Sequence, residues 1–159
     1  MMVSDEECMR RALTLAAQAE RVGDVPVGAV LVSGALIVEA CNEKESSADA
    51  TAHAEMLALR RASRALGTWR LSDATLYVTK EPCIMCAGAM IAARIRRLVY
   101  AANDPKGGAD GGAFDLLRSR ATNHRIEVEA GVLQSEASAQ LQRFFRARRA
   151  REGIERAAP

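Results

Sequence analysis

The residues of this chain that are best suited to chemistry lie in two short motifs. The first reads His53-Ala-Glu55, and the second reads Pro82-Cys-Ile-Met-Cys86. Imidazole and thiolate groups are the ligands that zinc prefers, and three such ligands leave a fourth position open for water. The residue types therefore predict that His53, Cys83 and Cys86 bind one zinc ion.

Glu55 is predicted to be the catalytic residue. It follows His53 by two positions, so on a regular helix its side chain points about 200° away and does not join the metal ligands. A carboxylate beside zinc-activated water accepts a proton from that water and returns it to the substrate. Both motifs open predicted helices, where free backbone N–H groups and the positive end of the helix dipole favour thiolates.

Two other chemistries fit part of this pattern. In a structural zinc site a fourth protein side chain fills the last position, and the remaining Cys and His candidates are Cys8, Cys41 and His124. A C-x-x-C pair is also typical of thioredoxin-like redox proteins. The H-x-E motif followed by P-C-x-x-C is instead the known signature of zinc deaminases that act on nucleobases, and it favours the open site.

Composition places the chain among ordinary globular proteins. Hydrophobic residues make up 49% and charged residues 26% of its 159 residues, which excludes a disordered, collagen-like or coiled-coil chain. This length predicts a single domain over residues 1–159, and the two motifs make it a zinc-dependent one. The longest apolar run, residues 83–93, is too short to span a bilayer, and the acidic N-terminus resembles no secretory signal. We therefore expect a cytoplasmic protein with no membrane partner.

Hydrophobic periodicity and turn residues predict strands that alternate with helices. The predicted helices cover residues 4–21, 52–66, 82–93 and 134–151, with a short one at 113–117. The predicted strands cover residues 25–32, 36–40, 74–79, 98–102 and 125–130. This alternation is typical of the α/β class, as a three-layer α-β-α sandwich with a central five-stranded mixed sheet.

Basic residues are concentrated at the C-terminal end of the chain. Residues 140–159 contain six Arg and two Glu, and Phe144 and Phe145 stand among them. Aromatic rings combined with arginines are typical of surfaces that bind single-stranded nucleic acid. The helix predicted over residues 134–151 is therefore a candidate RNA-binding element. The alternative is a helix whose Phe side chains enter the core and whose Arg side chains are only solvated.

Beyond the zinc motif, the chain is similar to the bacterial tRNA-specific adenosine deaminase family over nearly its whole length. The shared motifs stand in family order: Val25–Val30, Asn42, Thr51–Met56, Asp73–Thr79, Glu81–Met90, Arg94-Ile95, Asp104–Lys106, Asn123–Arg125 and Phe144–Arg146. The zinc motif alone marks the wider deaminase superfamily, whereas D-P-K, N-H-R and F-F-R are typical of the tRNA branch. Lys80, Asn103 and Asp110–Gly112 depart from the family pattern.

The resemblance implies a cytidine deaminase-like fold and a homodimer with one zinc ion per subunit. It also implies hydrolytic conversion of adenosine to inosine at the wobble position of a tRNA anticodon stem-loop, in an arginine tRNA. The base is expected to contact Val27, Asn42 and Ala54, and the ribose to contact Asp104. The other expected RNA contacts are Lys106, Asn123, His124, Arg125, Phe145, Arg146 and Arg149.

Several of these residues also have ordinary structural explanations. Asn42 and Asp104 are of types that often form turns, and a single His such as His124 often makes only a structural hydrogen bond. For the whole protein, a free nucleobase or nucleoside deaminase of guanine or cytosine type shares the zinc motif but needs no basic C-terminal helix. A zinc-stabilised RNA-binding module without turnover does not require Glu55.

Overall fold

The computed structural model describes residues 3–158, which form four α-helices and five β-strands. In chain order they are α1 (Asp5–Arg21), β1 (Gly28–Ser33), β2 (Leu36–Cys41), α2 (Ala54–Leu66), β3 (Thr75–Lys80), α3 (Ile84–Ala92), β4 (Arg97–Ala102), β5 (Glu127–Ala130) and α4 (Gln134–Ala157). The strands form one sheet in the order β2-β1-β3-β4-β5, in which β1 is antiparallel to both neighbours while β3, β4 and β5 run parallel. The predicted five-stranded mixed sheet is therefore confirmed.

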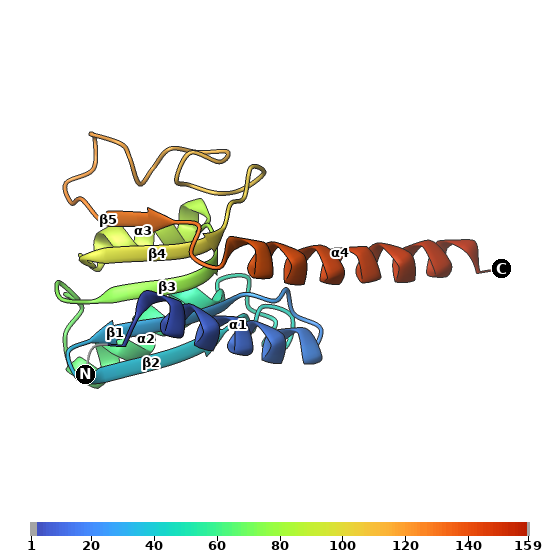
Figure 1. Ribbon diagram of the computed structural model, residues 1–159, viewed down its shortest axis with the longest axis horizontal. Coiled ribbons are helices and arrows are strands. Elements are labelled where there is room, and N and C mark those ends of the chain that lie inside the picture. The colour runs from blue at the N-terminus through green and yellow to red at the C-terminus, as the bar shows by residue number, and fades with distance from the viewer. Residues whose placement is uncertain (1–2, 159) are drawn as a thin grey trace.

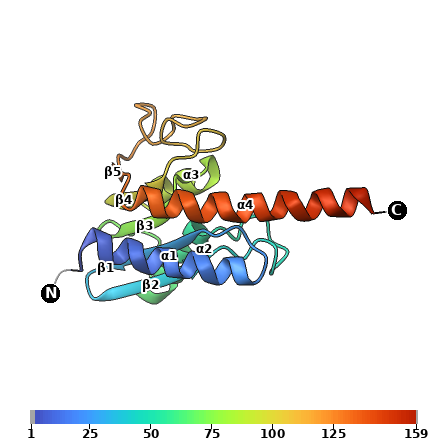
Figure 2. The same ribbon diagram turned by 45° about the vertical axis from the view of Figure 1, so that its right-hand side comes forward.

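Helices cover both faces of this sheet, because successive strand residues point to opposite sides. Leu31 and Leu98 belong to the larger apolar cluster, which also holds residues of α2 and α3. Val30 and Val99 belong to a second cluster with residues of α1 and α4. Figures 1 and 2 show α1 and α4 on the same face of the sheet. This arrangement confirms the three-layer sandwich.

The chain brings the two predicted motifs to the same end of the sheet, where β2 and β3 both finish. After β2 ends, a loop leads to His53, which is the residue that precedes the first turn of α2. After β3 ends, three residues reach Cys83, which precedes the first turn of α3 in the same way. The N-termini of α2 and α3 therefore face the same site.

A glycine allows β1 to approach α1 closely beside this end of the sheet. A Cβ atom added to Gly28 would lie 1.9 Å from the backbone oxygen of Ala12, so any larger residue would push the strand away from the helix. The residue before it, Val27, is buried and lines the cavity described below. The close contact at Gly28 therefore helps to position one wall of that cavity.

Three predicted elements differ from the structure in kind or by more than two residues at one end, and the others differ by at most two. Residues 113–117 are not a helix, because Ala113 and Phe114 both donate to the Gly108 carbonyl and fold back onto the preceding loop. The first strand begins at Gly28 rather than residue 25, since the three residues before it form a tight turn. The last helix continues past residue 151 to Ala157, where an exposed Gly costs only about 1 kcal/mol among good helix formers. No helix within residues 3–158 has the length and apolar character to cross a bilayer.

Asp5 anchors the start of α1 to the sheet. Its carboxylate accepts hydrogen bonds from the Tyr77 hydroxyl at 2.9 Å and from two Arg97 nitrogens at 2.7 and 2.8 Å. The Arg97 guanidinium holds the pKa of Asp5 below its usual value of 3.8. We expect Asp5→Asn to destabilise the protein by about 1 kcal/mol at pH 7, because a partly exposed charge-assisted network is worth about that much.

The pH dependence of this loss follows from the direction of the shift. A lowered pKa in the folded state means that the carboxylate stabilises the fold above its unfolded pKa and loses that effect as the pH falls through the folded pKa. Urea unfolding at pH 7 and near pH 3 measures the free energy of unfolding of wild type and of Asp5→Asn. The difference between these two free energies should therefore be smaller near pH 3 than at pH 7. The control is Glu6→Gln, whose exposed pair with Arg10 should be worth less than about 0.5 kcal/mol. A gap that stays constant with pH would contradict the prediction.

Candidate metal and catalytic site

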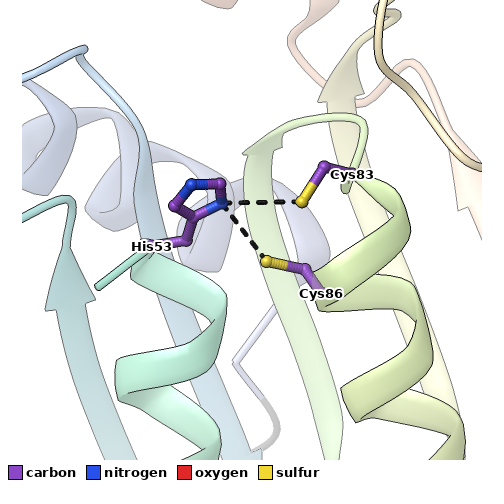
Figure 3. A group of neighbouring side chains, drawn as sticks. All are labelled: His53, Cys83 and Cys86. Carbon is purple, nitrogen blue, oxygen red and sulfur yellow. Dashed lines mark hydrogen bonds between the residues drawn. The ribbon is translucent and has the colours of Figure 1, made fainter. Parts of the chain in front are cut away.

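Three side chains from the two motifs meet in the structure. The Nδ1 atom of His53 lies 3.6 Å from the Cys83 sulfur and 3.5 Å from the Cys86 sulfur, and Figure 3 shows both sulfurs facing the same ring nitrogen. All three ligand atoms lie within 4.8 Å of one another. Cys86 is fully buried and His53 is half-buried.

Local structure explains why these side chains are free to converge. His53 and Cys83 each occupy the capping position of a helix, yet neither side chain caps its own helix by a hydrogen bond. Cys86 stands in the first turn of α3, three residues after Cys83, and so shares its face. Helix N-termini carry unpaired N–H groups and partial positive charge, which favour thiolates over thiols.

The electrostatics of the cluster favour a cation. The Cys86 thiol, followed by His53, lowers the pKa of Cys83 to about 3. The same contact with Cys83, together with burial and the nearby Glu55, raises the pKa of Cys86. The Cys83 thiolate also raises the pKa of His53. Metal ligands must be deprotonated, so binding of a metal ion here would release the protons that these groups carry.

The donor set fits a zinc ion held by three protein ligands. One imidazole nitrogen and two thiolates are typical zinc ligands, and zinc usually takes four. Among the residues that the structure describes, no further His, Cys, Asp or Glu belongs to this cluster. Of the candidates for a fourth ligand, His124 hydrogen-bonds the Ile95 carbonyl, Cys8 belongs to the apolar cluster between α1 and the sheet, and Cys41 packs against that cluster. The described residues thus supply three ligands to this cluster, one fewer than a closed structural zinc site uses.

A cavity of about 210 Å³ opens onto this cluster. His53, Cys83 and Glu55 line it together. Glu55 is buried with 4% of its surface exposed, and this burial raises the pKa of its carboxyl group. Since Glu55 stands outside the ligand cluster yet in the same cavity, it is placed to exchange protons with a molecule bound there.

Three residues predicted to contact the substrate also line this cavity, namely Val27, Asn42 and Phe145. The Asn42 side-chain oxygen accepts a hydrogen bond of 2.8 Å from the backbone nitrogen of Ala54. Asn42 therefore holds the start of α2 in addition to lining the cavity, and the Ala54 N–H already has a partner. Ala54 itself is fully buried beside His53 and Glu55.

Asp104 does not line the cavity itself, but its ion-pair partner does. Its carboxylate forms a 2.9 Å ion pair with Lys80, which lines the cavity. It also accepts hydrogen bonds from the backbone nitrogens of Lys106 and Gly107, so it forms the turn that its position before Pro105 suggested. The Lys106 side chain is exposed. Contacts of Asp104 and Lys106 with a substrate stay predictions.

The structure does not bring the N-H-R motif to the cavity. The Asn123 side-chain oxygen accepts a 2.8 Å hydrogen bond from Arg94, and the His124 ring lies 2.7 Å from the Ile95 carbonyl. These contacts tie the loop before β5 to the end of α3. Arg125, like Arg146 and Arg149 of α4, is exposed to solvent. Their roles in RNA binding stay predictions.

Several further cavity residues were not singled out from the sequence as functional. Glu81 is buried and accepts hydrogen bonds from the backbone nitrogens of Asp104, Asp110 and Gly112, so the loop after β4 folds around its carboxylate. The glycines of that loop were the signal in the sequence that could have indicated this close packing. A Cβ at Gly108 would lie 1.8 Å from a Glu81 oxygen.

Two other cavity residues carry no such signal. Asp24 is buried and accepts hydrogen bonds from the backbone nitrogens of Glu45 and Ser46, which fixes the loop that carries Lys44. In the sequence, Asp24 follows a glycine that ends a helix and Lys44 stands in a polar loop, and both are ordinary positions for those residue types.

Comparisons with known proteins agree with this geometry. A family model described as MafB19-like deaminase matches residues 3–149. The chain is 49% identical over 146 residues to a tRNA-specific adenosine deaminase of Bacillus subtilis, covering 91% of both chains. It superimposes with a TM-score of 0.80 and 43% identity on a structure from work on A-to-I editing by tRNA:A34 deaminases, covering 84% of this chain and 98% of that one.

A more distant solved structure shares the same fold. A guanine deaminase from Nitrosomonas europaea matches with a TM-score of 0.78 at 26% identity, covering 91% of this chain and 86% of that one. Its 26% identity is lower than the 49% shared with the tRNA-specific adenosine deaminase of Bacillus subtilis. This chain belongs to the family of tRNA-specific adenosine deaminases.

Proposed function

We propose that this protein hydrolyses adenosine to inosine at the wobble position of a tRNA anticodon loop. The observation that carries the proposal is that His53, Cys83 and Cys86 form one ligand cluster, and that His53, Cys83 and Glu55 line one cavity of about 210 Å³. A buried site suits a target that can leave the base stack, which costs less in a loop than in a duplex. Membership of the tRNA-specific family supports the choice of RNA substrate.

The proposed mechanism assigns each residue one task. His53, Cys83 and Cys86 would hold a zinc ion, which when bound lowers the pKa of a water molecule and supplies a nucleophile at neutral pH. Glu55 accepts a proton from the attacking water and delivers it to ring nitrogen 1 of adenine. The water oxygen adds to carbon 6, which then carries both a hydroxyl and an amino group. Glu55 takes the hydroxyl proton and passes it to the amino group, so that the bond from carbon 6 to nitrogen breaks, ammonia leaves and the carbonyl of inosine forms. Val27 and Phe145 pack against the base and exclude bulk water.

We also propose that the protein acts in the cytoplasm as a homodimer on an arginine tRNA. An apolar cavity of about 500 Å³ between α2 and α3 supports dimerisation. It is lined by Met56, Leu59, Ala89 and Ala92 and by Trp69, which is 60% exposed. Apolar surface of this kind on a soluble enzyme is typical of a subunit interface.

The direct test is to incubate the zinc-loaded protein with an anticodon stem-loop that carries adenosine at the wobble position. Free adenosine, guanine and cytidine are incubated in parallel, and inosine and ammonia are measured. We expect inosine only in the stem-loop. Release of ammonia from guanine or cytidine but not from the stem-loop would instead identify a free-base or nucleoside deaminase. Tight RNA binding without ammonia release would identify a binding module.

A further inference from the structure

Lys80 lies in the wall of the catalytic cavity and has no task in the mechanism above. It is the last residue of β3, and its ammonium group pairs with the Asp104 carboxylate at 2.9 Å. We propose that Lys80 is a specificity-determining residue, which positions Asp104 so that the site prefers a ribose to a deoxyribose at the target nucleotide. This inference rests on the proposed function and on the expected contact between Asp104 and the ribose.

The Asp104 carboxylate has one acceptor position left for a substrate. A carboxylate accepts about four hydrogen bonds, roughly two at each oxygen. The backbone nitrogens of Lys106 and Gly107 donate to Oδ1 at 3.1 and 3.2 Å, so this oxygen is occupied. Among residues 3–158, the polar partner of the other oxygen, Oδ2, is the Lys80 ammonium alone. A substrate hydroxyl can therefore be accepted only at the oxygen that Lys80 also contacts.

The 2′-hydroxyl is the sugar group that can donate to this oxygen. Within an RNA strand the 3′ and 5′ oxygens of a nucleotide are joined to phosphate, so the 2′-hydroxyl is its one sugar donor, and DNA lacks it. A base that reaches His53 and Cys83 inside the cavity leaves its sugar toward the opening. The side chains of Lys80 and Asp104 are 31% and 15% exposed, which places the pair between the cavity and solvent, where that sugar lies.

Lys80 keeps the Oδ2 atom of Asp104 charged and in place. Burial alone would raise the pKa of the Asp104 carboxyl group, but hydrogen bonds from Lys80 and from the loop backbone hold that pKa below 3.8. The loop itself holds Oδ1, whereas Lys80 connects Oδ2 to the end of β3. Without Lys80, Oδ2 can turn away from the cavity, and its hydrogen bond with a 2′-hydroxyl weakens.

The test measures the preference for ribose in wild type, Lys80→Met and Lys80→Arg. Each protein deaminates two stem-loops that differ only in a ribose or a 2′-deoxyribose at the target nucleotide, and the ratio of the two kcat/KM values is the ribose preference. Wild type should prefer ribose by about tenfold or more, since a hydrogen bond to a charged group contributes at least that much. Lys80→Met should lower the preference by about threefold or more, because a charge-assisted contact is lost. Lys80→Arg, which keeps the cation, should retain most of it.

The ratio separates this role from a phosphate contact and from a general loss of structure. Both stem-loops carry the same phosphates, so a direct contact of Lys80 with phosphate, or a partly unfolded variant, changes both kcat/KM values equally. Lys44→Met is the matched control, because Lys44 lines the same cavity but does not pair with Asp104. Its ribose preference should equal that of wild type. An unchanged ribose preference in Lys80→Met would overturn the proposal.

A double variant shows whether Lys80 acts through Asp104. In Asp104→Asn the amide oxygen can still bind the backbone of Lys106 and Gly107, while an NH₂ group that cannot accept replaces Oδ2. Adding Lys80→Met to Asp104→Asn should leave the ribose preference of Asp104→Asn unchanged, and a further loss would contradict the assigned role.

Binding measurements keep the test independent of turnover. The Kd values of Glu55→Gln proteins for the two stem-loops give the same ribose preference without deamination. A preference in Kd that depends on Lys80, together with absence of inosine from wild type, would overturn the proposed function alone.

Discussion

Replacing Glu55 with Gln is expected to lower the rate of inosine formation by about 10³- to 10⁴-fold, because general acid–base catalysis contributes up to that amount. Gln matches the shape of Glu but cannot carry a proton between water and substrate. Glu55 is buried in the cavity beside His53 and Cys83, yet it is not part of the metal-ligand cluster. Zinc content and RNA affinity should therefore remain close to those of wild type.

The measurement is single-turnover deamination of the stem-loop, with zinc determined by atomic absorption on the same samples. Glu39→Gln is the matched control, because Glu39 is an exposed acid on β2 that pairs with Arg11 of α1 and does not line the catalytic cavity. It should retain full activity. A Glu55→Gln protein that binds zinc and deaminates at the wild-type rate would exclude the proton transfer assigned to Glu55.

Removal of zinc is expected to have the second large effect, on both stability and activity. A ligand that binds only the folded protein stabilises it by about 4 kcal/mol when its free concentration exceeds Kd a thousandfold. For a chain of this size such a change lowers Tm by about 8–16 °C when the metal is withdrawn. Chelation should abolish inosine formation, and added zinc should restore it.

Cys86→Ser tests the same site without a chelator. Cys86 is fully buried and supplies one of the two sulfurs, so its loss should lower the zinc content well below one ion per chain and lower Tm. Cys41→Ser is the control, because Cys41 is a free cysteine outside the ligand cluster. Full zinc content and wild-type Tm in Cys86→Ser would show that the metal is held elsewhere.

The metal cluster could be predicted from the sequence because each ligand stands at a helix start. His53 and Cys83 occupy the capping positions of their helices and Cys86 lies in the first turn of α3, so the three side chains converge once the sheet brings α2 and α3 together. The sheet itself followed from apolar runs separated by turn residues. Regular elements repeat one local geometry, and local sequence is sufficient to indicate it.

The loop after β4 could not be predicted in the same way. Its course depends on the buried Glu81 carboxylate and on the Tyr100 hydroxyl, which donates to Asp110 at 2.8 Å. These groups come from other parts of the chain, and their distance in sequence hides the contact. The prediction of a helix at 113–117 was wrong because it considered only the local residues, which instead donate to the carbonyls of Gly108 and Ala109.

The ion pair between Lys80 and Asp104 could not be predicted either, because its two residues also lie far apart in the sequence. Lys80 is the last residue of β3 and was recognised only as a departure from the family pattern. Because β3 and β4 run parallel, their ends lie side by side, and the loop that follows β4 meets Lys80 there. The register of two strands was needed to see that an unusual lysine faces the aspartate expected near the ribose.

The dependence of the loop after β4 on Glu81 also limits how this enzyme can be redesigned. Moved into a scaffold that lacks this acid, the loop would lose the acceptor of three backbone N–H groups. A Cβ at Gly112 would lie 2.2 Å from the Asp104 carbonyl, and one at Gly108 would clash with Glu81 itself. A recipient scaffold must therefore receive the acid, the two glycines and the loop as one unit.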